Sequence, residues 1–305
     1  MKTNLLKNKV FSTLAALFTC ALWGISTPIV KMGYAYVDAT HTPSLFLWVG
    51  ALFAVAGFLT LGISSLTTKR FPLPKKGNVR IIAIVSLLQT VLQYALTYIA
   101  LMHTTSVKGS ILKSTDVFFV ALISSLIFKL EKLTAKKLIA CIIGFLGIIV
   151  MNLDGLSLNF NLMGDGLLVL GVLCYSFAVV IIRVFAENED PLVLSGWQMT
   201  IGGIILLLGG LALGGKVDFI GMLPIFAVLA AIYAISYSLW TALLKYNPPS
   251  SITIYSFMTP VFGVVFSALL LNEEGGMEPV NLVIALVLVC LGILLWGYEK
   301  KNKET

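Results

Sequence analysis

Two ionisable side chains lie inside an apolar stretch long enough to cross a lipid bilayer. The stretch runs from Val107 to Leu130 (VKGSILKSTDVFFVALISSLIFKL) and contains Lys113 and Asp116. At about 1.5 Å per residue, Asp116 would lie roughly 13 Å beyond Val107, near the middle of a hydrocarbon core about 30 Å thick. Charges at that depth cost about 2.5–3.5 kcal/mol each on insertion scales, so the two side chains should face protein or water and are functional-site candidates.

The spacing of three residues predicts that Lys113 and Asp116 pair on one face of a helix. Such a pair has two interpretations. It is either an internal ion pair that only lets the helix insert, or a pair of groups that takes part in the chemistry of the protein.

A polar stripe is predicted one span earlier, between Val79 and Leu101. Gln89, Gln93 and Thr97 recur every four residues and therefore share one helix face. Amides in that position could bind a zwitterionic or hydroxylated ligand. The alternative is interhelical hydrogen bonding, worth only about 0.6–2 kcal/mol per bond.

The composition places these residues in a membrane protein. Of the 305 residues, 58% are hydrophobic and 11% charged, with a mean hydropathy of +0.98. The net charge of +7 does not indicate nucleic-acid binding, because the basic residues form short clusters between apolar runs. The four cysteines lie inside apolar runs, and no metal-ligand spacing or GxxxxGK[ST] loop is present. We therefore expect no disulfide framework, no metal, no cofactor and no ATP-driven pump.

Ten apolar runs of spanning length predict an all-α, polytopic membrane protein. The first run follows a short basic segment and is too long for a cleaved signal peptide, so we expect a retained span. The ten predicted spans are, approximately, Val10 to Tyr34, Pro43 to Ile63, Val79 to Leu101, Val107 to Leu130, Ala135 to Met151, Met163 to Phe185, Leu192 to Leu213, Phe219 to Leu244, Ser250 to Leu271 and Pro279 to Tyr298.

The loop charges support this count. With a cytoplasmic N-terminus, the basic residues of the loops and tails fall on the inner side, and only Lys31, Lys108 and Lys216 fall on the outer side. This asymmetry fits the positive-inside rule. It predicts a multi-pass protein of the cell membrane with both termini in the cytoplasm.

The two halves of the chain resemble each other. FFVALISSLIFKLE (Phe118 to Glu131) is echoed by PVFGVVFSALLLNE (Pro260 to Glu273). Likewise, YALTYIAL (Tyr94 to Leu101) is echoed by YSLWTALL (Tyr237 to Leu244). Two five-helix repeats follow, in residues 1–151 and 163–305, with an outer connecting loop at 152–162. Because five is odd, the second repeat is inverted in the membrane, an architecture typical of transporters.

The chain resembles the EamA-like family of the drug/metabolite transporter superfamily. The resemblance covers most of the chain and includes ALWG (Ala21 to Gly24), IFKLEKLT (Ile127 to Thr134) and LLLNEE (Leu269 to Glu274). It implies a single-chain carrier that moves small metabolites, often outward, by alternating access. It also implies a central cavity lined by the first, third, fourth, sixth, eighth and ninth spans.

Aromatic residues in these spans are further candidates. Tyr233, Tyr237 and Trp240 follow one another at helical spacing in the eighth span. Trp23 and Tyr175 occupy equivalent places in the two halves and could stack on a substrate, although aromatic packing explains either one alone. A weaker candidate, which matches Lys113 in the repeat register, is Tyr255.

The predicted function is secondary transport of a small polar metabolite, such as amino acid export, and no enzymatic activity is expected. In this hypothesis Lys113 holds the charge of Asp116 in one conformation, and substrate or a proton replaces that contact in another. Both a monomer and a homodimer are compatible with this architecture. The alternative is a flippase-like accessory or structural subunit without solute transport, with a lipid-facing groove along the charged span.

Overall fold

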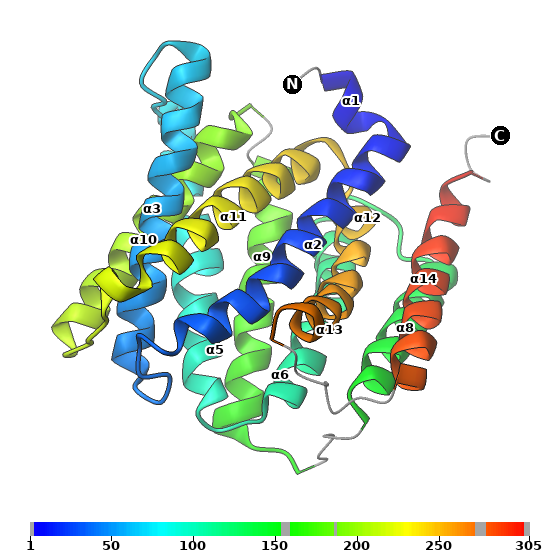
Figure 1. Cartoon of the computed structure of the whole chain (residues 1–305). Coiled ribbons are helices and arrows are strands. Elements are labelled where there is room, and N and C mark those ends of the chain that lie inside the picture. Colours follow the sequence, from blue (N-terminus) through cyan, green and yellow to red (C-terminus); the bar gives the residue numbers. More distant parts are fainter. Residues whose placement is uncertain (1–2, 154–158, 186–187, 272–278, 302–305) are drawn as a thin grey trace.

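The computed structural model describes residues 3–153, 159–185, 188–271 and 279–301. Within these ranges the regular structure is helical, and one isolated antiparallel bridge joins Val37 to Val217 (Figure 1). The all-α prediction is therefore confirmed. The elements are α1 (Thr3–Lys7), α2 (Lys9–Gly33), α3 (Thr42–Thr68), η1 (Lys76–Asn78), α4 (Val79–Val85), η2 (Ser86–Leu92), α5 (Gln93–Leu101), α6 (Ser106–Lys113), α7 (Asp116–Leu122), η3 (Ile123–Ile127), α8 (Ala135–Met151), η5 (Leu162–Gly166), α9 (Leu167–Phe185), α10 (Pro191–Ala212), α11 (Phe219–Tyr246), α12 (Pro249–Thr253), η6 (Ile254–Phe257), α13 (Met258–Leu271) and α14 (Pro279–Lys301).

The membrane spans follow the predicted runs closely. Eight helical stretches of the described chain are long and apolar enough to cross a membrane, and a shorter apolar helix lies within α14. The remaining predicted span is α8, whose 17 residues begin and end where the sequence predicts. The end of the second repeat motif, including Glu273, lies outside the described residues.

Polar side chains cap the N-terminal ends of several spans. Asn8 accepts hydrogen bonds from the first backbone N–H groups of α2, Thr134 does the same for α8, and Asp190 for α10. These caps satisfy backbone donors that have no partner within the helix. A polar capping residue therefore stands directly before each of these three helices.

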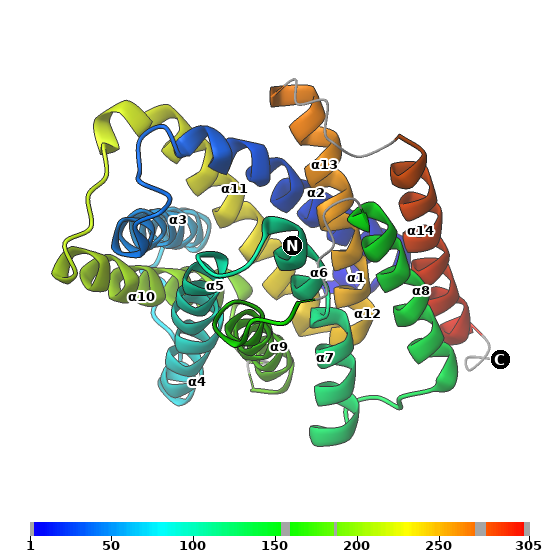
Figure 2. The same cartoon turned by 90° about the horizontal axis from the view of Figure 1, so that it is seen from below.

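Equivalent helices of the two halves pack directly against each other. Figure 2 shows α3 beside α10 at one end of the bundle and α8 beside α14 at the other. Both contacts are close because small residues face the partner backbone, as Gly50 does against Gly203 and Gly292 does against Gly144. Since a twofold axis brings equivalent elements together, these pairs place the repeat axis across the middle of the bundle.

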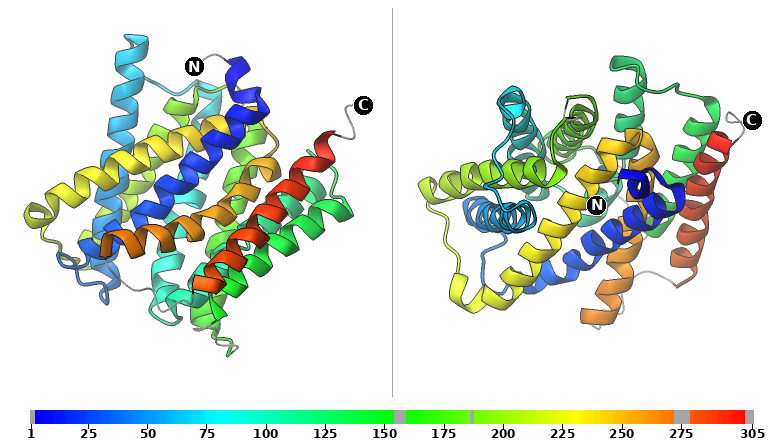
Figure 3. Two further views of the ribbon diagram at one scale, coloured as in Figure 1. Left: turned by 45° about the vertical axis from the view of Figure 1, so that its right-hand side comes forward. Right: turned by 90° about the horizontal axis from the view of Figure 1, so that it is seen from above.

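The first span, α2, crosses the bundle between α11 and α13 (Figure 3). Figure 1 also shows α1 and the C-terminal end of α14 on the same side of the molecule. An even number of spans places both ends on one side, as the sequence predicts. The position of α2 brings its inner face against both α11 and the broken ninth span.

The fourth span is not one continuous helix, and this corrects a prediction. α6 ends at Lys113, and α7 begins at Asp116. The hydroxyls of Ser114 and Thr115 donate to backbone carbonyls of the preceding turn, at 3.0 Å and 2.6 Å, contacts that bend helices. Because the helix is interrupted between them, Lys113 and Asp116 do not share a face, and no ion pair between them is found in the described chain.

The ninth span is interrupted at the matching place. Its short α12 passes through the 3₁₀ segment η6 into α13. In the repeat register Ser114 corresponds to Ser256, so the two breaks coincide. Each half of the protein therefore contributes one broken span to the centre of the bundle.

Candidate functional site

The centre of the molecule contains a cluster of aromatic side chains from several spans. The ring of Trp23, on α2, makes edge contacts with Tyr237 and Trp240 on α11, at centroid distances of 5.7 Å and 4.9 Å. Tyr237 and Trp240 are almost fully buried, whereas Trp23 is partly exposed. The structure thus brings together three of the residues that the sequence singles out.

Three further rings, from α3, α5 and α11, extend this cluster. Phe53 lies 4.7 Å from the ring of Tyr94 and 5.2 Å from that of Tyr233, measured between centroids. The hydroxyls of Tyr94 and Tyr237 share a hydrogen bond of 2.9 Å. We refer to Trp23, Phe53, Tyr94, Tyr233, Tyr237 and Trp240 as the central aromatic cluster.

The bond between Tyr94 and Tyr237 also locates the cluster within the membrane. These two residues are equivalent in the repeat register, and equivalent residues touch each other only near the symmetry axis. In inverted repeats that axis lies in the membrane plane, where transporters of this architecture hold their substrate sites. The cluster is therefore at the depth at which a substrate site is expected.

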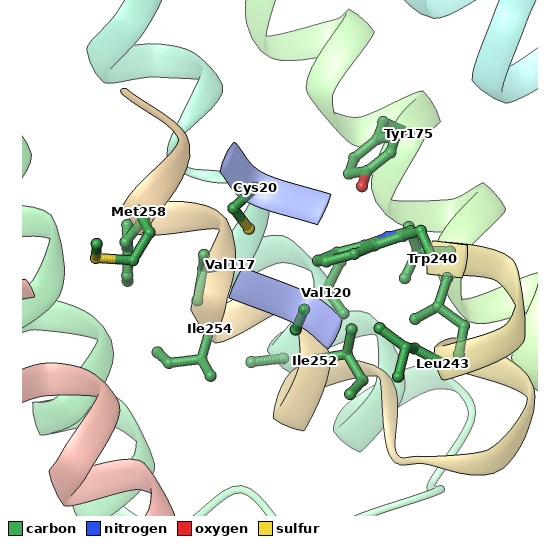
Figure 4. Packing of buried hydrophobic residues seen from close by; sticks show 14 of the residues in the cluster. Cys20, Val117, Val120, Tyr175, Trp240, Leu243, Ile252, Ile254 and Met258 are labelled. Atoms are coloured by element: carbon green, nitrogen blue, oxygen red, sulfur yellow. The ribbon is translucent and has the colours of Figure 1, made fainter. Parts of the chain in front are cut away.

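Tyr175 reaches the same region from α9. Figure 4 shows its ring facing Trp240, above a layer of apolar side chains from α2, α7, α11 and α12. Within that layer Val117 and Val120 are fully buried. This packing fixes Trp240 from below and leaves its indole Nε1 without a hydrogen-bond partner.

The predicted polar stripe of the third span contains a π-helical turn. Gln89 lies within η2, and Gln93 begins α5. Segments of π-helix frequently occur at functional sites. The interhelical bond in this region is made by Thr90, whose hydroxyl donates to Gln198 Oε1 at 2.8 Å. The side-chain oxygens of Gln89 and Gln93 are both buried without a hydrogen-bond donor.

Asp116 is 7% exposed and is held by the opposite half of the protein. The Ser256 hydroxyl lies 3.2 Å from Oδ1 and 3.1 Å from Oδ2 of this carboxylate. Asp116 is the first residue of α7 and Ser256 belongs to η6, so the bond joins the two helix breaks. Asp116 belongs to the first repeat, and its carboxylate accepts a hydrogen bond from the second repeat.

Lys113 has a different environment. Its side chain is exposed although its position falls within the span Val107–Ile127. No hydrogen bond or ion pair of its ammonium group is found among the described residues. An ionisable side chain within a span is a functional-site candidate by default.

The repeat counterpart of Lys113, Tyr255, has a structural environment. Its hydroxyl shares a 2.7 Å hydrogen bond with Thr13 Oγ1, and its carbonyl accepts a contact of 3.2 Å from Cys20 Sγ. Both partners lie on α2. Tyr255 thus attaches the ninth span to the first, and it is only partly exposed.

Two acidic residues organise the ends of the spans on the side of the termini. Glu131 forms a 2.7 Å ion pair with Lys137 and accepts hydrogen bonds from Ser250, at the start of α12. Glu189 accepts from the backbone N–H of Lys75 at 2.9 Å and from Asn78 at 3.0 Å. These contacts connect the two halves away from the centre.

The opposite side has its own polar contacts. Lys108 pairs with Asp165 at 2.6 Å, which ties α6 to η5, the turn that precedes α9. A separate surface hollow has a volume of about 420 Å³. It is lined by Tyr36, Asp38, His41, Ser44, Lys216, Val217 and Asp218. Hydrogen bonds from Thr40 hold the pKa of Asp38 below its ordinary value, so this carboxylate stays charged near neutral pH.

Sequence reasoning missed three members of the site. Ser256 was not singled out because serine is common in spans, and its role appears only once both helices break. Phe53 lies on a span that the resemblance does not place at the cavity. Tyr94 could have been found, since the repeat aligns it with Tyr237.

Inverted five-helix repeats that meet through two broken spans define the protein as a polytopic membrane protein with transporter architecture. Both halves match the model of the EamA-like transporter family, over residues 10–153 and 162–298. The chain belongs to that family, and the resemblance noted in the sequence is confirmed.

Curated relatives carry transporter names. The uncharacterized transporter YvbV of Bacillus subtilis (strain 168) is 23% identical over 305 residues, covering 97% of this chain and 94% of the relative. An uncharacterized transporter of Archaeoglobus fulgidus is 24% identical over 269 residues, covering 84% of this chain and 88% of the relative. A solved structure described as "Crystal structure of protein" shares the fold, with a TM-score of 0.78 at 15% identity and coverage of 98% and 100%.

Proposed function

We propose that this protein is a secondary transporter that exports a small polar metabolite, such as an amino acid, across the cell membrane. Transport proceeds by alternating access between the two repeats, with both termini in the cytoplasm. The observation that carries the proposal is the contact between Asp116 and Ser256, which joins two broken spans beside the central aromatic cluster. Broken spans in corresponding positions of inverted repeats are the best pointer to a transport site.

The polar groups at the centre fit a metabolite with hydrogen-bond donors. The amide oxygens of Gln89 and Gln93 are buried without donors, and such groups cost about 1–3 kcal/mol each when they stay unsatisfied. A bound ammonium, amide or hydroxyl group would supply the missing donors. Rings such as Trp23 would cover the apolar part of the same ligand.

In this mechanism Asp116 is the coupling group. The carboxylate holds the two helix breaks together through Ser256 and exchanges this partner for a proton or substrate when the repeats move. A buried carboxylate that binds a proton loses its charge, which weakens its hold on the opposite repeat. Proton movement then follows the conformational change in a monomer or in each subunit of a homodimer.

A second surface hollow lies on α3, away from the charged span. A hollow of about 360 Å³ is lined by Val55, Phe58, Leu59, Gly62, Ile63 and Leu66, all on α3. The alternative requires a groove along the span with Lys113 and Asp116. This hollow lies on another span and contains apolar side chains alone.

The test is flux in proteoliposomes, with a panel of labelled amino acids and other small metabolites, with and without a pH gradient. Wild type is compared with Asp116→Asn and with Asp38→Asn, a matched loss of a carboxylate on the surface. We expect gradient-dependent flux in wild type and in Asp38→Asn, and its loss in Asp116→Asn. No flux with any compound would contradict the transporter proposal, whereas unchanged flux and pH dependence in Asp116→Asn would remove only the coupling role.

A further inference from the structure

The two charged side chains in the fourth span, Lys113 and Asp116, do not pair with each other in the described structure. Asp116 is engaged by Ser256, whereas Lys113 has no ion pair or hydrogen bond among the residues that the structure describes. A lysine inside a membrane span without an anionic partner is costly and is a functional-site candidate by default. The side chain of Lys113 is exposed, so helices of this chain do not enclose it.

Other basic groups of the described spans are engaged or lie at span ends. Lys108 is paired with Asp165, and the ammonium group of Lys245 donates to the carbonyl of Glu189 at 2.6 Å. Arg183 donates to the carbonyl of Lys245 at 3.2 Å. These side chains are therefore used in connecting helix ends, and Lys113 is the cation that remains available near the middle of a span.

The second half of the protein offers no counterpart to this charge. The residue equivalent to Lys113 is Tyr255, whose hydroxyl is occupied by Thr13. The residue equivalent to Asp116 is Met258, which is buried and apolar. A positive group is thus present on one side of the paired helix breaks and absent from the other, so the site can orient a ligand that has one negative end.

We propose that Lys113 forms an anion-binding subsite and that the transported metabolite carries a carboxylate, an inference that rests on the proposed transport function. A carboxylate provides the single negative charge that one ammonium group can neutralise, and the charge-assisted hydrogen bond is stronger than one to a neutral acceptor. A phosphate carries nearly two charges and is typically met by several cations, whereas the other basic groups of the spans, such as Lys108 and Lys245, are engaged in contacts between helix ends. The carboxylate is therefore the anion that the surroundings of Lys113 fit.

The experiment compares matched ligands that differ only in this group. 3-Phenylpropionate and its amide, and L-phenylalanine and its amide, are tested for binding by the shift in melting temperature of the purified protein, and for flux in proteoliposomes. The variants are Lys113→Gln, Lys113→Arg and, as a matched loss of one positive charge, Lys136→Gln on the exposed surface of α8. Lys113→Arg keeps the charge and controls for loss of packing.

We expect the carboxylates to bind wild type roughly 10- to 100-fold more tightly than their amides, the range that one charged hydrogen bond provides. Lys113→Gln should lose this preference, while Lys113→Arg and Lys136→Gln retain it. Equal binding of acids and amides to wild type, or an unchanged preference in Lys113→Gln, would overturn the subsite. Because binding is measured apart from flux, flux without carboxylate preference contradicts this inference alone, and absence of flux contradicts the transport proposal.

Discussion

The hydrogen bond between Tyr94 and Tyr237 allows a test of the repeat contact at the centre of the protein. Tyr237 is 3% exposed, so Tyr94→Phe leaves its hydroxyl buried without a partner. That loss costs about 2 kcal/mol, within the range for unsatisfied buried groups. Tyr94 is partly buried, so for Tyr237→Phe we expect a smaller loss of about 1 kcal/mol.

The double variant distinguishes a real coupling from two independent losses. With both hydroxyls removed, neither group is left unsatisfied, and the total loss should be about 1 kcal/mol rather than the sum of about 3 kcal/mol. The measurement is unfolding in mixed micelles of sodium dodecyl sulfate and a mild detergent. Additive losses in the double variant would refute the assignment of a coupled hydroxyl pair on the repeat axis.

Two further predictions concern contacts away from the centre, and both use the same unfolding assay. Glu131→Gln removes the ion pair with Lys137 and weakens the contact with Ser250, and we expect a loss of about 3 kcal/mol; a loss below about 1 kcal/mol would show that this junction is dispensable. Gly50→Ala places a methyl group against the backbone of α10 and should cost about 3 kcal/mol, whereas Gly62→Ala meets open space and should gain up to about 1 kcal/mol. Equal effects of the two alanines would contradict the close packing of α3 on α10.

The spans could be predicted because hydropathy and charge act over whole segments. A run such as Ala135 to Met151 has to be helical in lipid, since its backbone groups have no other partners there. The repeat relation between Tyr94 and Tyr237 was also visible in the sequence. Their direct contact follows from that relation only when the position of the symmetry axis is known.

The details of the site depended on local backbone geometry that spacing does not reveal. Gln89 and Gln93 were predicted to share a stripe, but the π-helical turn between Ser86 and Leu92 changes the number of residues per turn at that place. The interhelical hydrogen bond that the sequence allowed for the glutamines is made instead by Thr90. The amide oxygens thus remain without donors, which is the property that makes them candidates for ligand binding.

The break in the fourth span explains why an expected ion pair became two separate charges. In a continuous helix, Lys113 and Asp116 would neutralise each other, and neither would need another partner. The hydroxyls of Ser114 and Thr115 bond to the preceding turn and interrupt the helix between them. Asp116 then meets Ser256 of the other repeat, while Lys113 is exposed and has no ion pair among the described residues. The segment 113–116 therefore does not form the internal ion pair that its spacing suggests. Its carboxylate contacts the other repeat, and its ammonium group has no ion pair among the described residues.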